Sequence, residues 1–66
     1  MMAVLEIACE VRMVTTAAIK IFDGKREAWI PKSQITDWTD GPDDAPGLGT
    51  TSIFIAEWLA TDKGLL

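Results

Sequence analysis

Hydrophobic and polar residues alternate over the first part of the chain. From residue 5 to residue 13 the odd positions are apolar, whereas Glu6, Glu10 and Arg12 all fall on even positions. A period of two is typical of a strand with one buried face, and the β-branched residues favour a strand over the helix that the Glu6 and Glu10 spacing would also allow. The pattern predicts a first strand with the inward residues Leu5, Ile7, Cys9, Val11 and Met13.

A hairpin is predicted over residues 18–30, around the turn signal Asp23-Gly24. A two-residue loop would pair Ile21 with Arg26 and mix the polar and apolar faces. A four-residue loop over residues 23–26 separates them, which predicts the pairs Phe22 with Glu27, Ile21 with Ala28, Lys20 with Trp29 and Ile19 with Ile30. The inner face then carries Ile19, Ile21, Ala28 and Ile30, and the outer face carries Lys20, Phe22, Glu27 and Trp29.

The second half alternates apolar stretches with chain breakers. Because Pro31 has no amide hydrogen, residues 31–34 are predicted to leave the strand or to form a short helical turn before Ile35 returns to the core. Short strands are predicted over residues 36–39 and 50–55, separated by an exposed loop over the Gly- and Pro-rich residues 41–49. The last apolar segment, residues 56–63, suits a helix that ends in a left-handed cap at Gly64, with Leu65 folding back onto it.

These elements indicate a mainly β fold in a single domain, residues 1–66. We expect about five strands in a small bent antiparallel sheet or partly open barrel of SH3-like or OB-like kind, with one short C-terminal helix. A chain of this size buries only about 60% of its unfolded surface. One cysteine and no histidine provide neither a disulfide nor a thiol and imidazole metal cage, so efficient β packing or self-association as a homodimer must supplement the core.

The sequence predicts no enzyme, no cofactor and no metal site. His and Tyr are absent, so acid–base chemistry would depend on carboxylates alone, and the aspartates do not have the spacing of a calcium loop. Residues 47–51 resemble a phosphate-binding loop superficially, but the lysine and the following helix are missing. Cys9 has inward parity, where a thiol acts as a small hydrophobe.

The first residues do not predict export or membrane insertion. They lack the basic region of a signal peptide, and Glu6 and Glu10 interrupt the apolar stretch. A membrane-spanning helix needs about 20 consecutive apolar residues, and no run approaches that length. We therefore expect a soluble protein of the cytoplasm that makes no membrane contact.

Charge is distributed unevenly within the net charge of −4. Residues 11–32 carry five cations and two acids, whereas residues 33–66 carry six acids and one cation. This segregation predicts a basic hairpin on an otherwise acidic molecule. Of the three tryptophans, Trp58 and Trp38 are expected to close one end of the core. Trp29 is expected on the outer face of the hairpin beside Lys20, where it is either exposed for binding or covered by the chain ends or a second subunit.

The two charged regions are alternative candidate binding sites. An acidic face could occupy the basic groove of a protein complex. A basic hairpin with stacking aromatic rings could instead hold single-stranded nucleic acid. The acidic candidates for partner binding are Asp37, Asp40, Asp43 and Asp44, and the candidates for nucleic-acid binding are Lys20, Phe22, Lys25, Arg26, Trp29 and Lys32.

Two segments resemble short proteins encoded by phages, prophages and other mobile elements. Residues 27–35 read EAWIPKSQI and residues 55–65 read IAEWLATDKGL, similar to WIPKSQI-like and EWLAxxKGL-like segments that flank a variable acidic loop in that group. The resemblance spans residues 11–66 and implies a mobile-element origin. This origin suggests two function classes, of which the net negative charge favours the first: a small non-enzymatic accessory protein that binds a host or phage protein complex, such as an anti-defence inhibitor of the anti-CRISPR type. The alternative is a single-stranded nucleic-acid-binding module of phage DNA metabolism.

Overall fold

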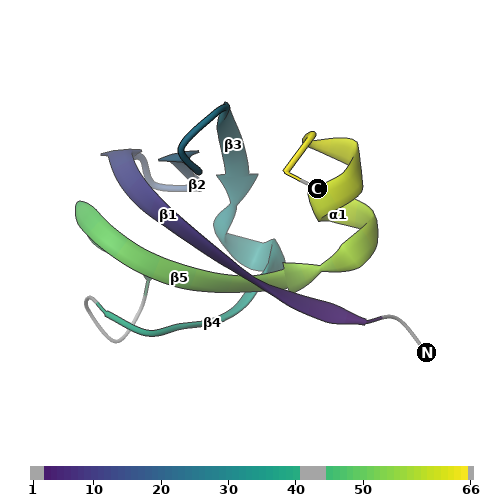
Figure 1. The fold of residues 1–66 in the computed structure, drawn as a ribbon. Coiled ribbons are helices and arrows are strands. Elements are labelled where there is room, and N and C mark those ends of the chain that lie inside the picture. Colours follow the sequence, from purple (N-terminus) through teal and green to yellow (C-terminus); the bar gives the residue numbers. More distant parts are fainter. Residues whose placement is uncertain (1–2, 41–44, 66) are drawn as a thin grey trace.

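The computed structural model describes residues 3–40 and 45–65, which form one antiparallel sheet and a short C-terminal helix. The described strands have the order β3-β2-β1-β5-β4, and the sheet stays open between β3 and β4. Figure 1 shows the sheet strongly bent, with β1 and β5 as long curved strands and α1 following directly from β5. The mainly β fold is therefore confirmed. The elements are β1 (Val4–Val14), β2 (Ala18–Phe22), β3 (Glu27–Pro31), the 3-10 turn η1 (Lys32–Gln34), β4 (Ile35–Trp38), β5 (Gly49–Ala56) and α1 (Glu57–Asp62).

The hairpin of β2 and β3 has the register that the sequence predicts. All four expected cross-strand pairs form, which leaves residues 23–26 as a four-residue loop. Asp23 stabilises this loop, because its Oδ1 accepts hydrogen bonds from the backbone N–H groups of Lys25 at 2.9 Å and Arg26 at 2.7 Å. Gly24 has a φ of 105°, a conformation that glycine adopts without steric penalty. Local contacts in the loop thus fix the register that separates the two faces.

β1 is long enough to pair with two neighbours in succession. Residues 4–11 pair with β5, and residues 10–14 pair with β2. The register with β2 shifts between Val11 and Met13, because β1 contains one extra residue at this point and forms a bulge. The prediction that Met13 faces inward is therefore wrong. After the bulge Met13 lies opposite Lys20 on the outer face, with 48% of its surface exposed.

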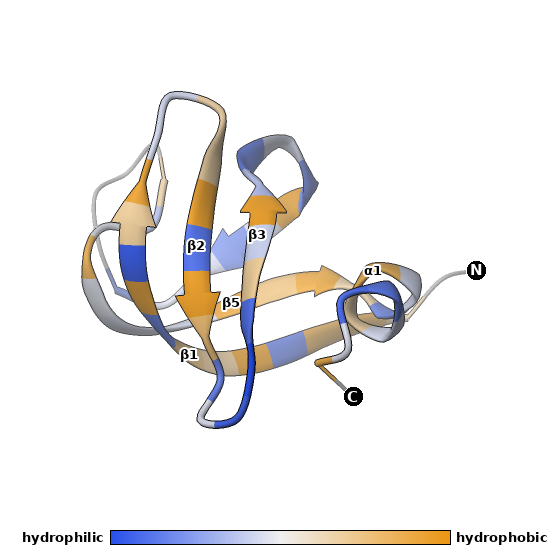
Figure 2. Ribbon diagram, turned by 90° about the horizontal axis from the view of Figure 1, so that it is seen from above, coloured by the Kyte–Doolittle hydropathy of each residue, from blue (hydrophilic) through white to orange (hydrophobic). Residues whose placement is uncertain are grey.

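The core lies on the inner face of the bent sheet and is dominated by isoleucine. Figure 2 shows one hydrophilic position between hydrophobic ones along β2, and every second residue of this strand, Ile19 and Ile21, is buried in the core. α1 covers part of it with Leu59 and Ala60. The buried cluster consists of Ile7, Cys9, Val11, Ile19, Ile21, Ile30, Ile35, Ile53, Ile55, Leu59 and Ala60, with Leu5, Ala28, Trp38 and Leu65 packed against it.

The connection from β3 to β4 follows the prediction closely. Pro31 is the last residue of β3, and the next three residues form η1. Ile35 then returns to the core and begins β4, which pairs with β5. β4 starts and ends one residue earlier than the predicted strand over residues 36–39. The missing amide hydrogen of Pro31 is compatible with this position, because β3 is an edge strand of the described sheet.

The Gly- and Pro-rich loop is only partly as predicted. Residues 41–44 of this loop lie outside the described residues. Leu48 is 72% exposed, in agreement with an exposed loop, but Ala45 and Pro46 are buried. Glycine and proline interrupt regular structure without dictating exposure, and an Ala-Pro pair has little polar surface to desolvate. β5 resumes at Gly49, one residue before the predicted strand.

α1 ends in the left-handed cap that the sequence predicts. Gly64 has a φ of 73°, and its N–H donates to the carbonyl of Thr61 at 3.1 Å. The N–H of Leu65 donates to the carbonyl of Ala60 at 2.9 Å, which completes a Schellman motif. Leu65 packs against the core as a result. No helix formed by residues 3–40 or 45–65 has the length and apolar character needed to cross a membrane.

Trp58 does not close the core, which corrects the prediction. It is 49% exposed, whereas Leu59 and Ala60 are buried. Successive residues of a helix are rotated by about 100°, so a helix of six residues that buries Leu59 and Ala60 turns Trp58 toward solvent. Trp38, the other tryptophan expected to cover the core, does pack against it from β4.

Candidate interaction surface

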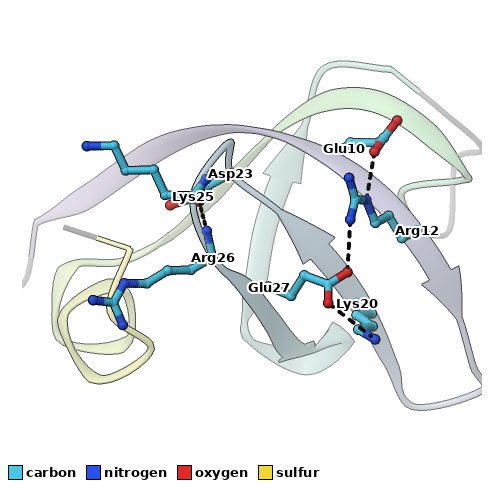
Figure 3. A network of polar contacts seen from close by, with 7 residues as sticks. All are labelled: Glu10, Arg12, Lys20, Asp23, Lys25, Arg26 and Glu27. Atoms are coloured by element: carbon cyan, nitrogen blue, oxygen red, sulfur yellow. Dashed lines mark hydrogen bonds and ion pairs between the residues drawn. The ribbon is translucent and has the colours of Figure 1, made fainter.

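Arg12 is the extra residue of the β1 bulge, and its side chain lies over the outer face of the hairpin. The guanidinium covers the ring of Phe22, with Cζ 4.0 Å from the ring centroid. Nε donates to Glu10 Oε1 at 2.8 Å, and Nη1 donates to Glu27 Oε2 at 3.1 Å (Figure 3). One side chain therefore connects β1, β2 and β3 across this face.

The strand register explains why these groups meet. Glu10 pairs with Phe22, and Phe22 pairs with Glu27, so the three residues form one row across three strands. Lys20 contributes a further ion pair, with its Nζ 3.6 Å from Glu27 Oε1. Two cations, Arg12 and Lys20, thus face two carboxylates. The outer face is less basic than the hairpin segment alone suggests, because the pairing of β1 with β2 brings Glu10 onto it.

The contacts of the network shift the pKa values of Arg12 and Glu27. Hydrogen bonds to Glu10 and then to Glu27 raise the pKa of Arg12. The hydrogen bond from Arg12 lowers the pKa of Glu27, with a smaller contribution from the charge of Lys20. These side chains remain open to solvent, so each attraction is weak and screened by salt. The network therefore orders the surface more than it stabilises the fold.

A second row on the same face is exposed and largely apolar. Met13 pairs with Lys20, and Lys20 pairs with Trp29, which confirms the predicted position of Trp29 beside Lys20. Trp29 is 41% exposed and Met13 is 48% exposed. The methylene stem of Lys20 lies between them and adds apolar surface of its own. This arrangement, the Met13–Lys20–Trp29 row, is an apolar contact area beside a charge-balanced network.

The residues predicted to bind nucleic acid are divided among different parts of the structure. Lys20 and Trp29 share the exposed row, whereas Phe22 is half-buried beneath Arg12. In Figure 3 the side chain of Arg26 extends toward the C-terminal segment, away from the ion-pair network. The other cations are found in the hairpin turn, Lys25 and Arg26, and in η1, Lys32.

Two of the four acidic candidates can be placed on the surface. Asp37 is exposed in β4, and its Oδ1 accepts the backbone N–H of the next residue at 2.8 Å. Asp40 is exposed just after β4, where its backbone N–H and carbonyl both bond to the Thr51 hydroxyl at 3.2 Å. The other two, Asp43 and Asp44, lie outside the described residues.

Reactive groups are scarce in the part of the chain that the structure describes. Burial raises the pKa of the Cys9 thiol to about 11, with a smaller contribution from the charge of Asp23. The thiolate form is therefore strongly disfavoured near neutral pH. Within residues 3–40 and 45–65, no three His, Cys, Asp or Glu side chains come together as a metal site would require.

Sequence reasoning missed the roles of Glu10, Arg12 and Met13. The alternation of polar and apolar residues continues unbroken through Arg12 and Met13, so it conceals the bulge that turns both side chains to the same face. Only the pairing of β1 with β2 reveals the bulge.

Comparison with known proteins identifies no relative: no protein family matches the chain, and no curated protein or solved structure shows significant similarity. The function must therefore be inferred from the surface itself. Its most informative part is the exposed row beside the Arg12 network.

Proposed function

We propose that this protein is a small non-enzymatic binding module that contacts a partner protein through the outer face of its hairpin. The observation that carries the proposal is the exposure of Trp29 and Met13 in one row across three strands. Tryptophan, methionine and arginine are enriched in protein interfaces, and tryptophan is prominent among the residues that contribute most binding energy. Arg12, held over Phe22, extends the same surface.

Charge balance favours a protein partner over nucleic acid at this face. Nucleic-acid binding depends on cations that neutralise phosphates, but Arg12 and Lys20 are already engaged by Glu10 and Glu27. Stacking on bases needs free aromatic faces, and the Phe22 ring is covered by the Arg12 guanidinium. Trp29 remains as a single stacking ring. The single-stranded nucleic-acid function therefore has less support than protein binding.

The exposed acidic residues Asp37 and Asp40 would assist the association with the partner. Asp37 and Asp40 are exposed on the β4 side, and the chain carries a net charge of −4. A field of this sign speeds the encounter with a basic partner and fixes its orientation, even where the charges lie outside the main contact. The resemblance to phage-encoded proteins adds a host protein complex as the expected partner, and inhibition of a host defence system as the expected outcome.

The chain offers a matched pair of tryptophans for the test. Trp29 is 41% exposed on the hairpin face, and Trp58 is 49% exposed on α1. The protein with a photo-crosslinking residue in place of Met13 is used to capture its partner in host cells, and Val4 at the start of β1 is the control position. Purified partner is then titrated against the wild type, Trp29→Ala and Trp58→Ala.

We expect one stoichiometric partner to be crosslinked from Met13 and not from Val4. Trp29→Ala should weaken the complex by at least about tenfold, the range of an interface hot spot, whereas Trp58→Ala should leave it unchanged. Asp37→Lys with Asp40→Lys should mainly slow association, and less so at high salt. Equal loss in both tryptophan variants would refute the hairpin interface. Capture of single-stranded nucleic acid that depends on Trp29 would replace the proposal with the alternative function.

A further inference from the structure

A cavity of about 420 Å³ lies between the hairpin turn and the C-terminal cap of α1. Its walls come from two segments that are distant in the sequence. Figure 3 shows the Arg26 side chain extended from the turn toward the C-terminal segment. The contact is close, because a Cβ atom placed on Gly64 would lie 3.4 Å from both Cδ and Nη1 of Arg26. The residues that line the cavity are Asp23, Lys25, Arg26, Gly64 and Leu65.

Two cations of the hairpin that form no ion pair among the described residues, Lys25 and Arg26, line the cavity. Arg12 and Lys20 form ion pairs with carboxylates on the outer face. Within residues 3–40 and 45–65, Lys25 and Arg26 form no such pair, and both line the cavity. The Arg26 guanidinium beside a concave surface attracts an anion, and the charge of Lys25, whose side chain extends in a different direction from Arg26 in Figure 3, adds to the field.

The hydrogen bonds around the cavity engage the groups that could repel an anion, although Asp23 keeps its negative charge because those bonds lower its pKa. Asp23 is the acid in the lining, and its Oδ1 accepts the backbone N–H groups of Lys25 and Arg26. The last carbonyls of α1 would also present negative charge here. Those of Ala60 and Thr61 accept the N–H groups of the Schellman motif instead. Among the described residues of the lining, two cations and one carboxylate give a formal charge of +1.

We propose that this cavity binds the oxyanion group, a phosphate monoester or a carboxylate, of a small organic ligand. Arg26 supplies the planar fork that recognises two oxygens at once, and Lys25 supplies a second charge. Leu65, half-buried in the lining, contacts the apolar part of the ligand. The volume lies within the range of about 300–1,000 Å³ that is usual for small-molecule sites. This site is separate from the Met13–Lys20–Trp29 row and independent of the proposed protein interface.

The test is a titration of the ¹⁵N-labelled full-length protein followed by NMR at low salt. The probes are inorganic phosphate, phenyl phosphate and benzoate, which distinguish the oxyanion and report on the apolar contact. We expect saturable shifts of the amide signals of Lys25, Arg26, Gly64 and Leu65, with phenyl phosphate binding more tightly than inorganic phosphate. Saturation by benzoate as well identifies a general oxyanion site, and saturation by the two phosphates alone identifies a phosphate site.

Three variants decide whether the cavity is responsible. Arg26→Gln should weaken binding of the tightest probe at least about tenfold, as expected for a lost hydrogen bond between charged groups, and Lys25→Gln should act in the same direction. Lys32→Gln removes a cation from η1, outside the cavity lining, and should have no effect. Unsaturable shifts for all three probes, or equal losses in Lys32→Gln and Arg26→Gln, would overturn the proposal. Trp29→Ala should leave anion binding intact, so this site and the protein interface can fail independently.

Discussion

At the scale of single residues, Arg12 determines the character of the hairpin face. As the extra residue of the bulge, it covers Phe22 and bonds to Glu10 on its own strand and to Glu27 on β3, across β2. Without its side chain, Glu10 and Glu27 would flank an uncovered aromatic ring with only Lys20 to balance them. A bulge thus converts a potential nucleic-acid platform into a surface of balanced charge.

Replacing Arg12 with glutamine should therefore weaken the fold slightly and uncover Phe22. We expect the melting temperature to fall by a few degrees at low salt, because exposed ion pairs and a cation over an aromatic ring each contribute little. In about 0.5 M salt the difference in melting temperature between the wild type and the variant should shrink, because salt screens the ion pairs of Arg12 but not its packing on the ring. Lys32→Gln, which removes a cation without an ion pair among the described residues, is the control. A loss of stability that is independent of salt would assign the effect to ring packing alone.

Cys9 should be nearly inert toward alkylating reagents in the folded protein. Its pKa of about 11, against an ordinary value of 9.0, implies about a hundredfold smaller thiolate fraction at pH 8, and burial obstructs access further. The measurement is the rate of iodoacetamide labelling, followed by mass spectrometry, in native buffer and in urea. Labelling should become fast only on unfolding. Equal rates in the two conditions would show that Cys9 is accessible in the native protein.

At the scale of elements, the sequence predicts the register of the hairpin but neither the bulge in β1 nor the orientation of Trp58. The hairpin register followed from the separation of faces, and the bonds from Asp23 to the turn amides give that register a physical cause. The bulge was not predictable, because the alternation of residue types passes through it unchanged. Trp58 was placed wrongly, because a short helix has several ways to face a core and Leu59 with Ala60 filled the space available.

The cap of α1 provides a test at this scale. Gly64→Ala should destabilise the protein by about 1–2 kcal/mol, because alanine is strained at a φ of 73°, whereas its Cβ would reach only ordinary van der Waals contact with the Arg26 side chain. Gly24→Ala is the matched comparison in the hairpin turn, because Gly24 has a φ of 105° and no atom lies within 4 Å of the added Cβ, so backbone strain alone should destabilise this variant too. Urea unfolding gives both values. An unchanged midpoint for Gly64→Ala would mean that the last turn of α1 adjusts without cost.

At the scale of the whole molecule, the sheet redistributes charge that the sequence segregates. The hairpin segment is basic when counted along the chain, but strand pairing places Glu10 beside it. The positive charge left unpaired in the described hairpin lies in the turn, at Lys25 and Arg26. No periodicity in the sequence could reveal this, because it depends on which strands become neighbours and where α1 ends. The mainly β class, in contrast, followed from the alternation itself.

The folded state should lose stability in acid through two carboxyl groups. Backbone hydrogen bonds from Arg26 and then Lys25 lower the pKa of Asp23 from its ordinary value of 3.8, and the hydrogen bond from Arg12 lowers the pKa of Glu27 from 4.5. Below these ordinary values the unfolded chain binds protons that the folded protein excludes. Stability is therefore complete above about pH 5 and falls as pH drops through the lowered pKa values.

Urea midpoints measured from about pH 7 to pH 2 should show this decline, and Asp23→Asn with Glu27→Gln should flatten it. The asparagine can still accept the two turn hydrogen bonds, so the double variant removes the titration while it keeps the loop. Asp62→Asn is the control, because Asp62 is exposed on α1 and forms no hydrogen bond or ion pair through its side chain among the described residues. The urea midpoint of the double variant falling as steeply with pH as that of the wild type would contradict this assignment. The acid sensitivity would then arise from repulsion among the six Lys and Arg residues, because their charges are no longer balanced once the ten acids are protonated.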